Sequence, residues 1–343
     1  MKKLVILTLA VALAAAGCSA KKEAPMTLAA GTPAYQLAKD LTTAIPSLHP
    51  DKVTLLVTAK KFDVTLGDVL QMFLDSMGTQ AQGLKNLDPQ RMKTVLERAG
   101  VQMGERKLLL EAAAAAKKSA APADIEKAVQ AQYARAGGEA QYLELLKTNG
   151  ASFDYVKKSI AEDLTIRAYL DGALAEGTKV AEAEIQKAYQ EDKTATVRHI
   201  LLLTQNKTAA EKVEIRKKME DILARAKKGE DFAALAKQFT EDPGSKENGG
   251  LYEDFGRGKM VKPFEDAAFS VPVGQISGIV ETAYGYHILK IENRKKETLP
   301  LDQVKPQIEA GLKQLKQNAA FDVLLTGLKK KAGFQAVSIN LGK

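Results

Sequence analysis

Two apolar stretches decide the fold of the second half of the sequence: residues 197–203 read Val-Arg-His-Ile-Leu-Leu-Leu, and residues 286–291 read Tyr-His-Ile-Leu-Lys-Ile. Both are short and rich in residues that favour strands, and Ile279-Val280 has the same character. Glycines multiply between residues 244 and 285. These features predict a mixed α+β domain from about residue 195, in which the two longer strands could be neighbours.

Each of these strands carries a histidine, His199 or His287, and the chain has only 3 histidines. The third, His49, lies in a proline-rich turn, and we assign it no role. No spacing of histidine, cysteine and carboxylate residues suggests a metal, so no metal site is expected. The histidine pair is therefore the first candidate for chemistry.

The first half of the chain, residues 35–192, has a helical hydrophobic pattern. Thr65, with Asp68 three residues later, resembles a capping box, so a helix is expected to start near residue 66. The run 53–58 is the only strand candidate in this half. Further helices are predicted at residues 123–136, 139–148, 153–175 and 181–191.

A second helix start is marked by Asp88, a good N-cap residue, and by Pro89 in the first turn. Gly100 and Gly104 lie inside the helix that follows and could bend it. An apolar stripe returns in residues 300–343, which predicts C-terminal helices that pack on the N-terminal ones. We therefore expect an all-α domain built from both ends of the chain.

The composition indicates a globular protein with several domains. A chain of 343 residues with 45% hydrophobic residues can bury two or three cores. The formal net charge is +8, but basic and acidic residues alternate, and aromatic residues make up only 6%. Binding to nucleic acid is not expected, because the sequence offers neither a basic cluster nor aromatic residues for stacking.

The N-terminus indicates export. Two lysines precede an apolar run, residues 4–16, that is too short to span a bilayer, where about 20 residues are needed. We predict a signal peptide at residues 1–17. The only cysteine, Cys18, follows small residues and resembles the lipobox at which bacterial lipoproteins are acylated and cut. The alternative is ordinary signal cleavage, with Cys18 a bystander.

Several motifs in the second half together resemble the parvulin (PpiC or rotamase) family. Arg198-His199-Ile200-Leu201 matches the opening strand of that family, and Tyr284-Gly285-Tyr286-His287-Ile288 matches its closing strand. Four further matches lie between them in family order, at residues 239–243, 248–250, 255–260 and 263–269. About 100 residues are covered, which makes chance agreement implausible.

The resemblance implies a fold and an activity. Parvulins have a four-stranded antiparallel sheet ringed by helices, and they rotate the peptide bond that precedes proline, without a cofactor. This bond rotates over a barrier of about 18–20 kcal/mol. An isomerase must bind the twisted amide more tightly than the planar forms, and each ~1.4 kcal/mol of that preference increases the rate tenfold.

Family position places Met260 and Phe264 in the pocket that holds the proline ring, with Phe269 nearby and Leu251 as a further substrate-binding candidate. The alternative is an ordinary core, because Met and Phe four residues apart also suit a buried helical face. Val261 stands where some relatives present a glutamine to the substrate.

The resemblance also implies a set of catalytic residues. Asp242 falls where relatives carry Asp or Cys close to the amide, although it could equally be a turn residue before proline. His199, His287 and Thr282 match a polar cluster beneath the family's active site. The alternative for this cluster is a purely structural hydrogen-bond network.

A second departure, besides Val261, qualifies the match, and one loop bears on substrate specificity. The stretch Leu251–Asp254 replaces the aspartate, leucine, glycine and aromatic residue that usually follow the paired glycines, so one glycine beside the pocket is lost. The loop at residues 204–208 contains one lysine in place of the arginine pair of phosphate-specific parvulins. Specificity for phosphoserine before proline is therefore not expected.

The whole layout resembles exported foldases and chaperones of the PrsA and SurA type. The predicted fold class is α+β, and we expect an isomerase that assists the folding of exported, proline-containing polypeptides. The alternative is a non-catalytic periplasmic chaperone, a holdase whose parvulin domain only binds peptides. The predicted segments are a signal peptide at 1–17, a flexible tether at 18–34, a helical chaperone domain at 35–192, a parvulin domain at 195–293 and C-terminal helices at 300–343.

The predicted location follows from the signal peptide and Cys18. We expect the folded part to be anchored to an envelope membrane through the acylated cysteine and to face the periplasm or another extracytoplasmic space. Ser19, in place of an aspartate, is compatible with the outer membrane.

Overall fold

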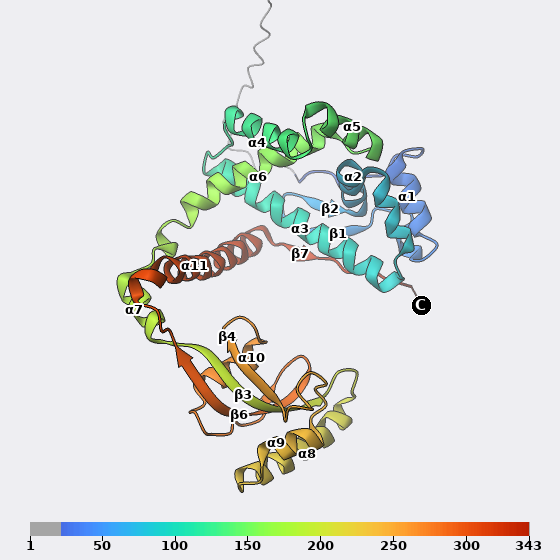
Figure 1. The fold of residues 1–343 in the computed structure, drawn as a ribbon. Helices are drawn as coiled ribbons and strands as arrows, with labels where there is room; N and C mark the ends of the chain where they lie inside the picture. Colours follow the sequence, from blue (N-terminus) through green and yellow to red (C-terminus); the bar gives the residue numbers. More distant parts are fainter. Residues whose placement is uncertain (1–21, 343) are drawn as a thin grey trace, which may run out of the picture. The chain divides into compact units, whose positions relative to one another are not determined.

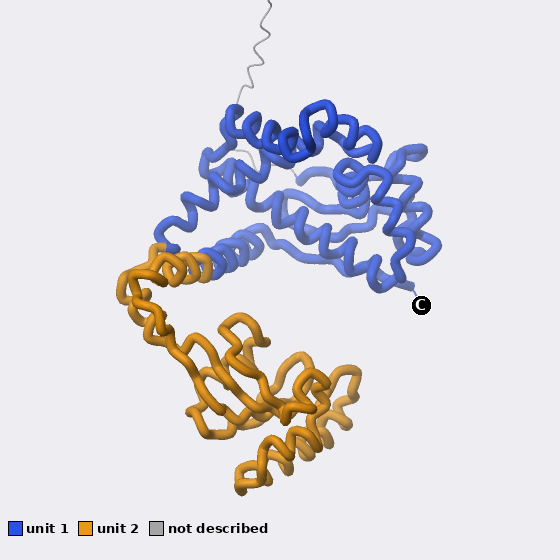
Figure 2. The backbone as a smooth tube through the Cα atoms, in the orientation of Figure 1, with its two compact units in different colours: residues 1–178, 316–343 blue, residues 179–315 orange. Residues whose placement is uncertain are grey.

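The computed structural model describes residues 22–342, so the expected signal peptide and Cys18 lie outside the described residues. The chain divides into two compact units (Figure 2). Unit 1 comprises residues 1–178 and 316–343, and unit 2 comprises residues 179–315. The long helix α11, Leu301–Ala332, contributes its first half to unit 2 and its second half to unit 1.

Unit 1 contains a small antiparallel sheet with the order β2-β1-β7 (Figure 1). The strands are β1 (Leu55–Thr58), β2 (Asp63–Thr65) and β7 (Gln335–Ala336). The prediction of an all-α domain was therefore wrong. Only β1 had a visible strand pattern, because β2 and β7 are too short to show alternation and β7 pairs with β1 from the far end of the chain.

The helices of unit 1 begin at the capping residues that the sequence predicts. Thr65 and Asp68 form a capping box at the start of α2, and the Asp88 side chain accepts a hydrogen bond from Arg91 N at the start of α3. The described helices are α1 (Pro33–Leu41), η1 (Pro46–Leu48), α2 (Leu66–Met77), η2 (Gly78–Asn86), α3 (Pro89–Ala115), α4 (Pro122–Arg135), α5 (Glu139–Asn149), α6 (Phe153–Ala173) and η3 (Glu176–Thr178).

Gly100 and Gly104 let α3 approach the sheet closely. A Cβ on Gly100 would lie 2.7 Å from Leu56 Cβ, and one on Gly104 would lie 2.7 Å from the Phe334 ring. α3 continues through both positions to Ala115. The two glycines therefore serve helix–sheet packing, in place of the expected bend.

Residues 22–31, part of the predicted tether, contact unit 1. Lys22 pairs with Asp63 at 2.6 Å, and Glu23 N donates to Lys61 O. Leu28 packs against the core of the unit. From residue 22 onward this segment is therefore attached to the fold, although it forms no helix or strand before α1.

Unit 2 is built around a four-stranded antiparallel sheet with the order β4-β3-β6-β5, which confirms the predicted sheet (Figure 1). The two apolar stretches become its long central strands, β3 (Asp192–Leu203) and β6 (Gly285–Lys296). The other described elements of the unit are α7 (Glu182–Gln190), α8 (Ala209–Lys227), α9 (Phe232–Phe239), β4 (Leu251–Gly256), α10 (Lys262–Ser270) and β5 (Val280–Glu281).

Alternation along β3 and β6 divides the side chains between two faces. Ile200 and Ile288 belong to the core beneath α8 and α9. Val197 and Leu289 belong to the core beneath α10. Side chains at odd-numbered positions of the two strands, from Val197 on β3 and up to Leu289 on β6, consequently lie on the α10 side of the sheet. Both histidines, at 199 and 287, are among them.

The first half of α11 packs on α7 within unit 2, where Val304 and Ile308 form a small core with Ile185. Within unit 1, Leu328 and Ala332 of the same helix pack against the main core, and Ile339 is buried in it. Within residues 22–342, no helix combines the length and the apolar character needed to cross a membrane.

Candidate active site

The pairing of β3 with β6 brings the two histidines together. His199 lies opposite Leu289, and His287 lies opposite Leu201, so the histidines are diagonal neighbours on one face of the sheet. Their rings stack with centroids 5.8 Å apart, and they are only 3% and 4% exposed. The expectation that the two strands are neighbours is thus confirmed.

Asp242 is placed by hydrogen bonds that join the two preceding residues to the backbone of β3. Glu241 N donates to Leu201 O, and Leu203 N donates to the Glu241 carboxylate at 2.7 Å. The Thr240 hydroxyl, which is fully buried, accepts from Leu201 N. The Asp242 side chain is thereby directed towards the histidine pair.

Three donors converge on one carboxylate oxygen of Asp242. His199 Nε2 lies 3.0 Å from Asp242 Oδ2, and the Tyr252 hydroxyl lies 3.1 Å from it. The Ser245 hydroxyl donates to the same oxygen and also lies 2.9 Å from His199 Nε2. Burial by itself would raise the pKa of Asp242, but the hydrogen bonds from Ser245, His199 and Tyr252 outweigh it and lower that pKa. The carboxylate is therefore ionised at neutral pH.

His199, His287 and Tyr252 are neutral at pH 7. Burial lowers the pKa of His199 despite the opposing effect of Asp242. Burial and then the neighbouring His199 lower the pKa of His287 to about 4. Burial and the Asp242 charge raise the pKa of Tyr252 to about 12. An ionised carboxylate can only accept, so the neutral His199 carries its proton on Nε2.

The remaining contacts hold the His287 ring. Its Nε2 lies 2.8 Å from the Thr282 hydroxyl, which also accepts from Tyr284 N. Nδ1 of both histidines is buried and has no hydrogen-bond partner among the described residues. The Phe264 ring lies edge-on to both imidazoles, with its centroid 5.4 Å from that of His199 and 5.5 Å from that of His287. The aromatic ring and the histidine pair therefore form one packed wall.

A cavity of about 300 Å³ opens above this wall. Apolar and polar side chains meet in it, and their convergence is typical of a binding site. Its lining residues are His199, Leu201, Asp242, Tyr252, Lys259, Met260, Val261, Phe264, Tyr284 and His287.

Most of the predicted site residues meet at this cavity. His199, Asp242, His287, Met260 and Phe264 line it, and Thr282 contacts His287 from behind. Among the described residues, no cluster of three or more His, Cys, Asp and Glu side chains is arranged as a metal site.

Two predicted substrate-binding residues, Phe269 and Leu251, do not line the cavity. Phe269 packs against Phe255 beneath the Arg257 guanidinium, which lies 4.1 Å from the centre of its ring. Leu251 begins β4 and pairs with Arg198 on β3. Because Tyr252 points into the cavity, alternation along the strand directs Leu251 away from it.

Tyr252 and Ser245 are the partners of Asp242 that sequence reasoning missed, and Leu201, Lys259 and Tyr284 are further lining residues that it did not assign. Tyr252 belongs to the stretch Leu251–Asp254, which departs from the family pattern, and that departure was the available signal. The preceding Gly250 has a φ of +77°, and a Cβ there would lie 2.2 Å from His199 O. Gly250 therefore lets β4 approach the histidine strand closely enough for Tyr252 to reach Asp242.

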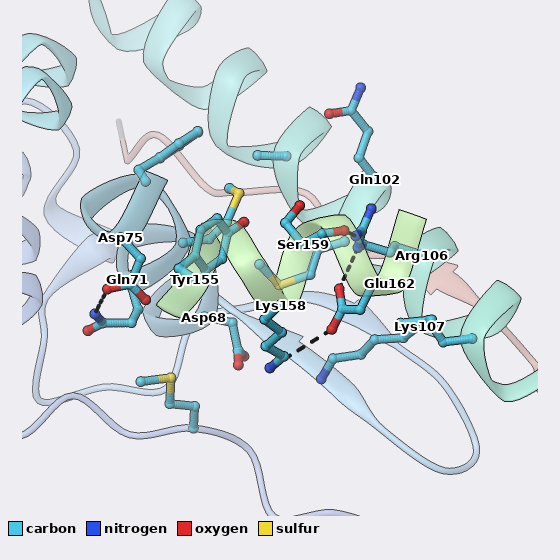
Figure 3. A pocket seen from close by; sticks show the side chains of 16 residues that line it. Asp68, Gln71, Asp75, Gln102, Arg106, Lys107, Tyr155, Lys158, Ser159 and Glu162 are labelled. Carbon is cyan, nitrogen blue, oxygen red and sulfur yellow. Dashed lines mark hydrogen bonds and ion pairs between the residues drawn. The ribbon is translucent and has the colours of Figure 1, made fainter. Parts of the chain in front are cut away.

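A second cavity, of about 590 Å³, lies in unit 1 among α2, α3 and α6 (Figure 3). Several of its polar side chains pair with one another. Gln71 donates to Asp75, and Arg106 pairs with Glu162 at 2.7 Å. Its apolar lining is Met26, Met72, Phe73, Ala99, Met103 and Leu110.

Comparison with known proteins fits the geometry of unit 2. Residues 183–295 match the family described as the PPIC-type PPIASE domain. This segment is a parvulin domain. The match begins in α7 and ends in β6, so the parvulin domain contains every residue of the cavity described in unit 2.

The curated relatives are foldases. The parvulin-bearing chain is 39% identical over 180 residues to foldase protein PrsA of Geobacillus sp. (strain WCH70), a match that covers 52% of this chain and 59% of the relative. It is 50% identical over 102 residues to foldase protein PrsA 4 of Bacillus cereus, covering 30% of this chain and 36% of the relative. The chain thus spans little more than half the length of the first relatives it matches.

Solved structures of the same name also match. The crystal structure of peptidylprolyl isomerase PrsA from Bacillus anthracis is 28% identical and has a TM-score of 0.44. The match covers 70% of this chain and 98% of that chain.

Proposed function

We propose that this chain is a peptidyl-prolyl cis/trans isomerase and foldase that acts on exported polypeptides. The observation that carries the proposal is that Met260 and Phe264 line the same cavity as a partly buried, ionised carboxylate, Asp242, which lies beside a neutral histidine pair. The relatives named as foldases and the parvulin domain support the same conclusion.

Met260 and Phe264 would bind the proline ring and place the preceding amide beside the polar wall. A planar amide owes its planarity to resonance, which puts negative charge on its oxygen. Twisting removes part of that charge, so a carboxylate close to the oxygen disfavours the planar forms more than the twisted one. This difference lowers the rotation barrier, and the reaction makes or breaks no bond.

The histidine pair would act by holding the other groups of the cavity wall in place. His199 and Ser245 hold the Asp242 carboxylate, and Thr282 holds His287 against the other imidazole. Since both rings are neutral, they keep the wall rigid without adding charge near the amide. In this proposal His199, Asp242, His287 and Thr282 form the catalytic network, while Met260 and Phe264 bind substrate.

The test compares two phenylalanines in a prolyl-bond isomerisation assay on the full chain. Phe264→Leu changes the cavity wall, and we expect at least about a tenfold loss of kcat/KM, equivalent to ~1.4 kcal/mol. Phe269→Leu changes the same core outside the cavity and should leave kcat/KM within about twofold. A wild-type rate equal to the uncatalysed rate would refute the isomerase.

The cavity of unit 1 favours a second function, that of a holdase. Methionines are flexible and adapt to varied apolar partners, and Met26, Met72 and Met103 contribute to its lining. We expect Met72→Gln with Met103→Gln to weaken suppression of client aggregation while isomerisation continues. In the alternative in which the parvulin domain only binds peptides, Phe264→Leu would weaken suppression and no isomerisation would be measured.

We further propose that residues 1–17 are a signal peptide and that Cys18 carries a lipid anchor outside the cytoplasm. The apolar run at 4–16, the small residues before Cys18 and the relatives named as foldases support this. The proposed segments are a helical chaperone domain at 35–192, a parvulin domain at 195–293 and a C-terminal segment at 300–343. Cys18→Ser should move the protein from the membrane fraction to the soluble fraction, and unchanged fractionation would contradict the anchor.

A further inference from the structure

Lys259 stands at the mouth of the parvulin cavity. It precedes Met260 in the turn before α10, and its side chain is exposed while still lining the cavity. Among residues 22–342 it has no hydrogen-bond or ion-pair partner. A substrate group could therefore reach its ammonium without displacing a partner.

The other titratable residues of the cavity provide no competing cation. His199 and His287 are neutral near pH 7, and Tyr252 keeps its proton. Asp242 is anionic, but its charge lies within the wall, where His199, Ser245 and Tyr252 donate to it. The cavity thus combines one cation at its mouth, Lys259, with one anion in its wall, Asp242, to which three groups donate.

The charged side chains near Lys259 in the sequence already have partners. Arg257 lies over the Phe269 ring, and Lys262 pairs with Asp266 at 2.7 Å. Glu265 accepts a hydrogen bond from Gly258 N at 2.5 Å. Lys259 is therefore the cation of this turn that remains available to a substrate.

We propose that Lys259 selects substrates that carry a carboxylate side chain, glutamate or aspartate, next to the proline. Met260, the neighbour of Lys259, lines the part of the cavity assigned above to the proline ring, so a flanking side chain of the substrate would lie near the ammonium. This inference rests on the proposed isomerase function and adds a substrate class to it.

The experiment measures exchange by NMR with the full chain and two series of short peptides. One series places Glu, Gln or Lys directly before proline, and the other places them directly after it. In one series we expect kcat/KM for the Glu peptide to exceed that for the Lys peptide by about fivefold, the upper range for an exposed ion pair. Lys259→Gln should abolish this ratio, and Lys259→Glu should invert it.

Lys262→Gln is the matched control, because Lys262 lies on the same segment but is paired with Asp266 outside the cavity. It should keep the wild-type ratio. Equal rates for Glu and Lys peptides in both series, or a ratio that persists in Lys259→Gln, would overturn the inference.

The same titrations separate this inference from the proposed function. If the Glu, Gln and Lys peptides all exchange at the uncatalysed rate, the isomerase proposal fails. The dissociation constants of the Glu and Lys peptides then still test Lys259, because a charge preference in binding needs no turnover. Equal constants for wild type and Lys259→Glu would overturn the inference in that case as well.

Discussion

The two cavities of this protein use their charged residues in opposite ways. In unit 2, two buried histidines and the partly buried Asp242 belong to the cavity wall, and the pKa of each of the three is lowered there. In unit 1, Arg106 and Glu162 neutralise each other within the lining. The first arrangement positions a fixed charge beside a substrate, whereas the second leaves methionines and a phenylalanine for apolar contact. Chemistry is therefore expected in unit 2 and passive binding in unit 1.

The largest predicted effect is a pH dependence of the stability of unit 2. Burial lowers the pKa of His287 from 6.5 to about 4, so the folded state favours the neutral ring. The free energy of unfolding keeps its full value above pH 6.5. It falls as the pH falls towards 4, because His287 binds a proton in the unfolded chain at a higher pH than in the folded one. We expect a loss of about 3 kcal/mol across this window, measured by hydrogen exchange of the β3 and β6 amides.

A matched pair of histidine variants tests the cause of that slope. His287→Asn should flatten it, whereas His49→Asn, which changes a half-exposed side chain in unit 1, should leave it as in wild type. An unchanged slope in His287→Asn would show that other groups account for it.

The next effect concerns the Asp242 carboxylate. Asp242→Ala leaves the hydroxyls of Ser245 and Tyr252 and Nε2 of His199 without their shared acceptor. We expect kcat/KM to fall about 30-fold, equivalent to about 2 kcal/mol. Asp242→Asn retains an acceptor, so its kcat/KM should lie between the values for Asp242→Ala and wild type. A full rate in Asp242→Ala would assign this residue a turn role only.

A substitution in the cavity of unit 1 should lower stability and leave kcat/KM unchanged. Arg106 contacts Glu162, Asp163 and the Ser159 carbonyl, so Arg106→Met breaks the link between α3 and α6. We expect unit 1 to lose about 1.5 kcal/mol of stability while kcat/KM stays at the wild-type value. Lys107→Met, one residue along α3, is the control. A parallel fall in kcat/KM would erase the distinction between the two cavities.

The smallest effect is expected from Tyr252→Phe, which removes one of the three donors to Asp242. The expected cost is about 1 kcal/mol, a reduction of about fivefold in kcat/KM. The pKa of Asp242 should rise as well, since that hydrogen bond helps to lower it. NMR titration of the Asp242 carboxyl carbon checks this, and an unchanged pKa would contradict the account.

Much of the architecture could be predicted from local sequence signals. The capping residues Thr65 and Asp88 mark helix starts that the structure confirms. The apolar stretches around His199 and His287 predicted the central strands, because each is long enough to show its character. The strands β2 and β7 could not be predicted, since two or three residues give no period and their stability comes from pairing with β1.

The site residues that family motifs name could be predicted from the sequence. Residues whose direction depends on the register of a strand could not. Whether Leu251 or Tyr252 points into the cavity depends on the register of β4, and this register shifts opposite Ala195 and Val197. Asp254 has a φ of 47°, a left-handed conformation that no pattern of hydrophobic residues indicates. Tyr252 was therefore missed, and Leu251 was assigned to a pocket that it does not line.

The most direct test of the central claim follows a protein whose refolding is limited by X-Pro isomerisation. Unaided, that step takes about 10–100 s at 25 °C. The account predicts that catalytic amounts of the full chain accelerate the slow phase in proportion to concentration, and that Asp242→Ala accelerates it far less. A slow phase that keeps its uncatalysed rate at every concentration of the wild-type chain would contradict it.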